Sequence, residues 1–225
     1  MKFGLGIVAG VLIGALLTAT ALTGLAAQAT SAAGAAVRRA EPFTRLTTRR
    51  VEPVDPARYT DAQRAYVASG AGASTQLNVC MQNLDVCRKV WELTLQLASH
   101  HSIPVREKEL LILRTAWLSR GDYVWARHST GGGKTAGLTA EDLAKIVKGP
   151  GAPGWSAFDA TLLRAADDLH TSRFISNATW KALSEKYDTS QLLEVVFTVG
   201  HYTVLSMFHN SVGLLLDDGM KGPPD

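Results

Sequence analysis

Apolar residues recur at helical spacing along most of the chain beyond about residue 58. The segment VCRKVWELTLQLASHH, with Asp85 as its candidate N-cap, places apolar side chains three or four residues apart at Val86, Val90, Leu93 and Leu97. The segment from Arg106 to Ser119 follows Pro104 and is apolar around most of its surface. It is therefore expected to be a central helix.

Further helices are predicted by their capping residues. Thr60 or Asp61, Thr139 with Asp142, Ser156 and Ser176 are candidate N-caps. The last apolar segment, about residues 190 to 216, is apolar nearly all round and is expected to be buried. No alternating strand pattern or Asn-Gly hairpin competes with these helices, so the sequence predicts an all-α helical bundle.

The amino terminus has the pattern of an export signal. Lys2 precedes an uncharged run rich in small and apolar residues that ends in Ala27-Gln28-Ala29, so residues 1–29 are read as a secretory signal peptide cleaved after Ala29. An uncleaved membrane anchor is the alternative, because the run is long enough to span a bilayer. After cleavage we expect a periplasmic or secreted protein without stable membrane association.

The predicted signal is followed by a flexible leader over 30–57, a helical domain over 58–218 and a tail over 219–225. The leader is rich in Ala, Thr, Pro and Arg and has no steady periodicity. The net charge of +3 is far from the basic surface that nucleic-acid binding needs, so nucleic acid is not an expected partner.

The two cysteines, Cys80 and Cys87, lie seven residues apart. In one unbroken helix that spacing is a rise of about 10.5 Å, which is too long for a disulfide. A break at Asn83 or Asp85 would bring the sulfur atoms together. The sequence leaves both alternatives open, a disulfide or two small buried side chains.

The run STGGGKTAG, residues 129–137, contains the residue types of a phosphate-binding loop. That loop requires glycine at the position occupied here by His128, and it follows a strand, whereas a helix is expected before this run. We therefore read Gly131 as the end of the helix that carries His128, and the remaining glycines as its flexible exit.

Three stretches together resemble the carboxymuconolactone decarboxylase and alkylhydroperoxidase-D-like family. They are REKELLILRTAWLSRGDYVWARHSTGGGKTAGLTAEDLAKI, GWSAFDATLLRAADDLH and LLEVVFTVGHYTVLSMFHNSVG. In peroxidase-like members a glutamate precedes a C-x-x-C pair and then a histidine. The resemblance places the glutamate at Glu109 and the histidine at His128, and puts Gly121 and Val124 at the two cysteine positions. It implies the family's all-helical fold and proton relay, without its redox pair.

Glu109 and His128 are the predicted acid and base, because a carboxylate bonded to imidazole raises the basicity of the imidazole. Tyr123 is a candidate oxyanion donor and so a third catalytic residue. Expected substrate-binding residues are Gly121 and Val124 beside the histidine, Trp117 and Trp125 as aromatic walls, Arg127 for a carboxylate, and His201. His201 and His209, eight residues apart, are expected to face one cavity. A metal bound by His128, His201 and Glu109 is conceivable, but no metal or cofactor is predicted.

The leading hypothesis is an exported, cofactor-independent lyase, decarboxylase or isomerase. Its substrate would be a small carbonyl compound, a lactone or an aromatic-derived carboxylate. The alternatives are a non-catalytic exported helical protein and a thiol-dependent peroxidase that uses Cys80 and Cys87. The family resemblance further implies a homo-oligomer, a trimer or hexamer, for which the apolar last helix is a candidate interface.

Overall fold

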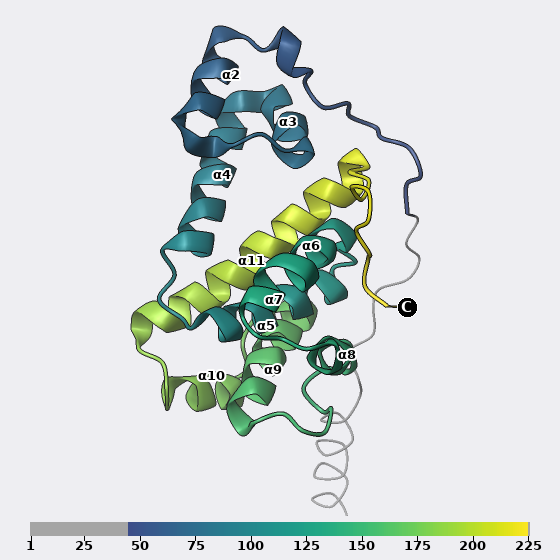
Figure 1. The fold of residues 1–225 in the computed structure, drawn as a ribbon. Coiled ribbons are helices and arrows are strands. Elements are labelled where there is room, and N and C mark those ends of the chain that lie inside the picture. The colour runs from purple at the N-terminus through teal and green to yellow at the C-terminus, as the bar shows by residue number, and fades with distance from the viewer. Residues whose placement is uncertain (1–44, 225) are drawn as a thin grey trace, which may run out of the picture. The chain divides into compact units, whose positions relative to one another are not determined.

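The computed structural model describes residues 45–224. The predicted signal peptide, residues 1–29, and the first part of the predicted leader lie outside the described residues. Helices make up most of the described chain, and no strand is found in it (Figure 1). Their bounds are α2 (Asp61–Tyr66), α3 (Thr75–Cys80), α4 (Leu84–Ser99), α5 (Val105–Leu118), α6 (Asp122–Arg127), α7 (Gly133–Thr135), α8 (Ala140–Lys148), α9 (Ala157–Ser172), α10 (Asn177–Ser184) and α11 (Thr189–Val212).

Helix α5 is the central helix, as its sequence predicts. It packs against α6, α8, α9 and α11, and four successive side chains, Leu110 to Leu113, are fully buried. A helix that is apolar around most of its surface must be covered on most sides, and these neighbours provide the cover. The all-α prediction is confirmed.

The predicted N-caps are correct with one exception. Thr60 and Thr139 form capping boxes, and Ser156 and Ser176 accept backbone N–H bonds at the starts of α9 and α10. Asp85 is not the cap of α4. The chain makes a 3₁₀ turn over Met81–Asn83 and enters α4 at Leu84, so the side chain of Asn83 is the cap and Asp85 falls in the first turn.

Arg114 ties three helices together from inside the core. Its guanidinium group pairs with Asp167 of α9, with Nε 2.6 Å from Oδ1, and donates to the carbonyl oxygens of Ile146 and Val147 at the end of α8. An arginine that is only 2% exposed is tolerated because its donors meet charged or carbonyl acceptors. This contact fixes α5 against α8 and α9.

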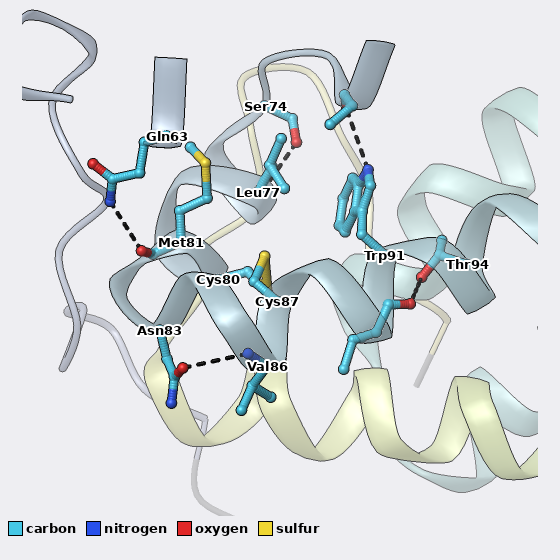
Figure 2. Close-up of a disulfide and its surroundings, with 12 residues drawn as sticks. Gln63, Ser74, Leu77, Cys80, Met81, Asn83, Val86, Cys87, Trp91 and Thr94 are labelled. Atoms are coloured by element: carbon cyan, nitrogen blue, oxygen red, sulfur yellow. Dashed lines mark hydrogen bonds between the residues drawn. A yellow bond between two sulfur atoms is a disulfide. The ribbon is translucent and has the colours of Figure 1, made fainter. Parts of the chain in front are cut away.

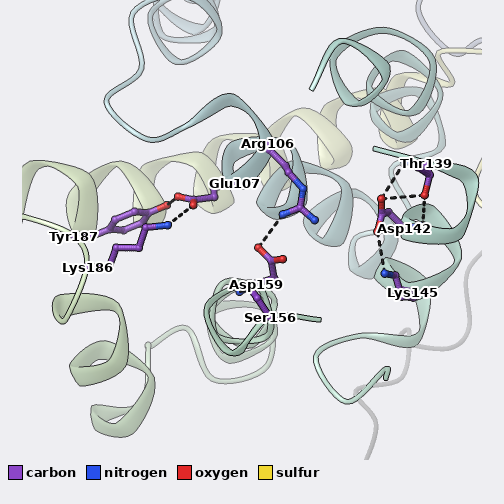
Figure 3. Close-up of polar contacts among 9 residues, drawn as sticks. All are labelled: Arg106, Glu107, Thr139, Asp142, Lys145, Ser156, Asp159, Lys186 and Tyr187. Atoms are coloured by element: carbon purple, nitrogen blue, oxygen red, sulfur yellow. Dashed lines mark hydrogen bonds and ion pairs between the residues drawn. The ribbon is translucent and has the colours of Figure 1, made fainter. Parts of the chain in front are cut away.

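Nearer the start of α5, two polar contacts anchor the helix from other directions (Figure 3). Arg106 binds Asp159 of α9, with Nη1 2.9 Å from Oδ1. Glu107 accepts hydrogen bonds from Lys186 and Tyr187, which lie between α10 and α11. Burial, followed by the bond to Glu107, raises the pKa of Tyr187, so its hydroxyl stays a donor. The orientation of α5, which carries Glu109, is thus set at several points.

Cys80 and Cys87 form a disulfide between the end of α3 and the start of α4 (Figure 2). The 3₁₀ turn between these helices brings the two Cα atoms to 5.3 Å. The interrupted helix considered from the sequence is therefore the one that the chain adopts.

Helix α11 is buried on one side only, which corrects the prediction that it is buried all round. Val195, Thr198 and Leu205 face the core, whereas Leu193, Phe197, Val204 and Met207 are exposed. By length and composition α11 could cross a membrane, and half of its most apolar window is buried inside the protein.

Part of the predicted leader packs against the helices. The backbone N–H groups of Arg50 and Val51 donate to the carbonyl of Val212 at the end of α11, and Val54 donates to Asn78 of α3. The predicted boundaries of the leader, the domain and the tail stay predictions.

Candidate functional site

A cavity of about 200 Å³ lies between α4, α6 and α11 beside the start of α3. Its lining combines apolar and hydrogen-bonding side chains: Ser74, Gln76, Trp91, Thr94, Ala98, Tyr123, Val124, Arg127, His128, Tyr202, Leu205 and His209. A concave, mostly apolar space with a few converging polar groups is the usual form of a small-molecule site.

His128 is joined to Glu109 at the wall of this cavity. Nδ1 of His128 lies 2.8 Å from Oε2 of Glu109, and since a carboxylate only accepts, Nδ1 carries the proton and Nε2 is the basic nitrogen. The Glu109 side chain is 4% exposed and the His128 side chain 21%. The imidazole can therefore reach a ligand, and the carboxylate acts only through it.

The glycine run at residues 131–133 packs against the Glu109–His128 pair. The interpretation of this run as the flexible exit of a helix was therefore wrong. Gly131 does not end a helix, because the chain continues through a π-helical turn at His128–Gly132 into α7 and leaves helical geometry only at Gly137. A Cβ on Gly132 would lie 2.4 Å from Oε1 of Glu109. Glycine at position 132 thus lets the backbone pass directly over the carboxylate.

Two tyrosines complete the surroundings of the histidine. The ring of Tyr202 meets that of His128 edge to face, with centroids 5.0 Å apart, and fixes the orientation of the imidazole plane. The hydroxyl of Tyr123 donates to Asp217 at 2.9 Å, and burial followed by this bond raises its pKa to about 12. Tyr123 lines the cavity, but its proton is already engaged by Asp217, so it could donate to an oxyanion only by exchanging that partner.

The structure brings together some of the residues predicted for substrate binding and separates others. Val124 and Arg127 line the cavity with His128, and the Arg127 side chain is exposed at its rim. Trp117 and Trp125 do not line it. Trp117 packs between the two large core clusters under the guanidinium of Arg114, and Trp125 is 3% exposed in one of those clusters. Both indoles are packing residues in the core.

Gly121 and His201 also lie outside the lining of the cavity. A Cβ on Gly121 would be 2.2 Å from Oγ of Ser206, so the missing side chain allows α6 to pass close to α11 and leaves no space for a substrate. Nε2 of His201 is 2.9 Å from the hydroxyl of Thr94, and burial lowers the pKa of His201 to about 4. His201 supports Thr94, which does line the cavity.

Sequence reasoning missed Trp91, Tyr202 and the role of His209 in this cavity. Trp91 comes from α4, more than 30 residues before His128, and nothing in its own segment links it to the histidine. His209 could have been preferred to His201, since both were expected to face one cavity. Only the crossing of α11 over α6 decides which of them does so. Within residues 45–224 no cluster of three or more His, Cys, Asp or Glu side chains has metal-binding geometry.

Residues 85–168, which include Glu109 and His128, match the model of the carboxymuconolactone decarboxylase family. The resemblance of the chain to this family is confirmed. No curated protein matches the chain. The family matched here includes decarboxylases and peroxidase-like members, so the family alone leaves the reaction open.

Solved structures confirm the alkylhydroperoxidase-D-like fold of this carboxymuconolactone decarboxylase-like chain. An alkylhydroperoxidase AhpD core, an uncharacterised peroxidase-related protein from Ralstonia eutropha JMP134, has a TM-score of 0.63 at 13% identity, over 80% of this chain and 95% of its own. An uncharacterised peroxidase-related protein from Silicibacter sp. TM1040 has a TM-score of 0.62 at 13% identity, over 79% and 96%. A protein of unknown function from Agrobacterium tumefaciens has a TM-score of 0.57 at 12% identity, over 64% and 99%.

Proposed function

We propose that the chain is an enzyme in which Glu109 and His128 move a proton on a small carbonyl compound, a lactone or an aromatic-derived carboxylate. The contact between Nδ1 of His128 and the buried carboxylate of Glu109 carries the proposal. It leaves a basic nitrogen facing a cavity large enough for a compact organic molecule. The match to the carboxymuconolactone decarboxylase family over this pair supports a lyase or isomerase reaction.

The proton transfers follow from the tautomer of His128. In an isomerisation, Nε2 takes a proton from the carbon next to the substrate carbonyl, the electron pair becomes an enolate, and the imidazolium returns the proton to another carbon. In a decarboxylation, the bond to the carboxylate breaks, carbon dioxide leaves, and an imidazolium that is already protonated delivers its proton to the enolate carbon. Glu109 stabilises the imidazolium in both reactions through the bond to Nδ1.

Turnover of a panel of lactones, keto acids and aromatic-derived carboxylates tests the proposal. His128→Gln and Glu109→Gln should lower kcat about 10²- to 10⁴-fold, the usual contribution of a positioned acid or base. His170→Gln and Glu141→Gln make the same chemical changes in α9 and α8, away from the cavity, and should retain activity. Turnover that survives in His128→Gln would disprove the role of the pair.

A thiol-dependent peroxidase is the second candidate, because two of the structural neighbours are named as peroxidase-related. The two cysteines are joined to each other, and Cys87 is fully buried. Peroxide turnover that needs both thiols would favour this function. A Cys80→Ser, Cys87→Ser double variant with unchanged activity would favour proton transfer. If the protein is a non-catalytic helical protein, none of these substitutions should change ligand affinity or turnover.

We also propose that the protein is exported. The signal-like pattern of residues 1–29 supports export, and the Cys80–Cys87 disulfide fits an oxidising compartment. A mature protein whose first residue is Thr30 is the expected result of amino-terminal sequencing after expression with the full signal.

A further inference from the structure

His209 is a buried imidazole without a hydrogen-bond partner. It lies on α11, is 2% exposed, and neither of its ring nitrogens has a partner within the described structure. Its neighbours are the rings of Tyr123, 5.1 Å away, and Phe208, 5.4 Å away, which offer no strong acceptor at these positions. Burying an unpaired polar group costs about 1–3 kcal/mol, so such a group calls for an explanation.

The position of His209 explains why this polar group is kept, because its side chain lines the same cavity as His128. The apolar part of the cavity's lining includes Val124, Leu205 and Trp91. We propose that His209 recognises the substrate of the proposed reaction by a hydrogen bond to an uncharged oxygen, the carbonyl or hydroxyl of a compact molecule with an apolar body. This inference rests on the proposed function and names the substrate class.

The chemistry of a neutral imidazole determines which groups it can bind. One ring nitrogen donates and the other accepts, so it pairs with a carbonyl or a hydroxyl oxygen. Burial lowers the pKa of His209 to about 3, so the ring is uncharged at neutral pH and gives no ion pair to a carboxylate. A rotation of the ring by 180° about its Cβ–Cγ bond exchanges the positions of Nδ1 and Cδ2, and of Nε2 and Cε1. The ring then fills nearly the same space, and a nitrogen can face a ligand where a carbon stood before.

The apolar body of the substrate can be accommodated next to the proposed hydrogen bond from His209. A second cavity of about 230 Å³ adjoins the first, and Gln76, Trp91 and Leu205 line both. The rest of its lining is the disulfide, Asn83 and apolar side chains of α4 and α11. Figure 2 shows Trp91 and the disulfide side by side along α4. An aromatic or aliphatic group attached to the bound oxygen can therefore extend past Trp91 without losing apolar contact.

Binding of two matched probes separates this inference from the proposed reaction. Acetophenone carries the carbonyl oxygen, and ethylbenzene has a similar body without it. Quenching of tryptophan fluorescence, to which Trp91 contributes, would report their affinities. The wild-type protein should bind acetophenone at least tenfold more tightly than ethylbenzene, and His209→Leu should abolish that preference. His128→Gln should retain it, even where it abolishes turnover.

The free energy of unfolding, measured together with kcat/KM, distinguishes a histidine that binds substrate from one that only supports the fold. His209→Leu removes an unpaired polar group from the core, so its free energy of unfolding should equal or exceed that of the wild type while kcat/KM falls at least tenfold. Thr198→Val on the same helix is the matched control, because the fully buried Thr198 hydroxyl also has no partner and lies away from the cavity. It should gain stability with unchanged kcat/KM.

Three results would overturn the inference: no oxygen-dependent preference in the wild type, the same preference in His209→Leu, or unchanged kcat/KM in His209→Leu. If His209→Leu fails to fold, His209→Met, an apolar side chain of similar length, replaces it in the probe assay. It should also lose the preference for acetophenone, and a folded His209→Met protein that keeps the preference would overturn the inference. Loss of turnover in His128→Gln with an intact probe preference would leave both proposals standing.

Discussion

At the scale of single residues, the absence of a side chain at position 132 lets the chain pass over the carboxylate of Glu109. A methyl group at this position would lie 2.4 Å from Oε1, well inside contact distance, so Gly132→Ala must push the carboxylate or the π turn aside. Because Glu109 orients His128, we expect kcat to fall about 10²-fold, the order that a 1 Å misplacement costs.

The neighbouring glycine is the control for this substitution. A Cβ on Gly131 meets nothing within 4 Å, so Gly131→Ala should keep wild-type kcat. Both variants should retain the far-ultraviolet circular dichroism of the wild type, since alanine favours helix. Equal activities of the two variants would contradict the argument that contact with Glu109 requires glycine at position 132.

The two buried histidines of α11 make the stability of the protein depend on pH. Burial lowers the pKa of His201 to about 4 and of His209 to about 3, whereas both titrate near 6.5 in the unfolded chain. Between these values the unfolded chain binds more protons than the folded one. The free energy of unfolding should therefore fall as the pH falls below about 6.5, by up to ~1.4 kcal/mol per pH unit for each histidine.

Urea unfolding at pH 7.5, 6.5, 5.5 and 5.0 measures this slope. At pH 7.5, about one unit above the unfolded pKa, both histidines are almost entirely neutral in both states and contribute little slope. The difference between wild type and His209→Leu isolates one of them, and it should grow steadily as the pH falls from 6.5 to 5.0. A difference that does not change with pH would show that His209 titrates normally in the folded protein.

At the scale of elements, the Cys80–Cys87 disulfide fixes the turn between α3 and α4, and so the position of Trp91 beside the cavity. Closing a loop of this length restricts the unfolded chain by about 2.5 kcal/mol in the chain-entropy model. The Cys80→Ser, Cys87→Ser double variant should lose roughly that free energy of unfolding, measured in urea. Under the proton-transfer proposal its kcat should stay close to wild type under conditions in which it is folded.

The sequence predicts elements better than it predicts how they meet. Capping side chains act over three or four residues, so the starts of α8, α9 and α10 follow from local chemistry. Asp85 was wrongly preferred to Asn83 because both residues can cap, and the 3₁₀ turn over Met81–Asn83, which decides between them, leaves no mark in the capping pattern.

The candidate site shows the same division between local and long-range information. The pairing of Glu109 with His128 was anticipated from a family pattern, and the structure places the two side chains in contact. Trp117 and Gly121 were assigned to the cavity because they are near His128 in sequence, yet they face Arg114 and Ser206. Which faces of α6 and α11 meet is decided by contacts between residues more than 80 positions apart, which no local pattern records.

At the scale of the whole molecule, the exposed face of α11 is an apolar stripe. Leu193, Phe197, Val204 and Met207 are each at least half exposed, and with the exposed Gly200 they follow the alternating spacing of three and four residues found in paired helices. Val86 of α4 is also exposed and lines the second cavity together with Val204. Leu93 of α4 is exposed as well and lies in a surface depression with Phe197. Contiguous apolar surface of this kind is typical of an interface.

We therefore propose that α11 pairs with a second copy of the chain, with Gly200 allowing close approach. Size-exclusion chromatography with light scattering should give an oligomer for the wild type and a smaller mass for Phe197→Glu and Met207→Glu, because a charge buried in the interface is costly. Phe174→Glu is the control, since Phe174 is equally exposed but lies beyond α9, away from the stripe. A wild-type protein that stays monomeric at all concentrations, or glutamate variants that keep the wild-type mass, would assign the stripe another role.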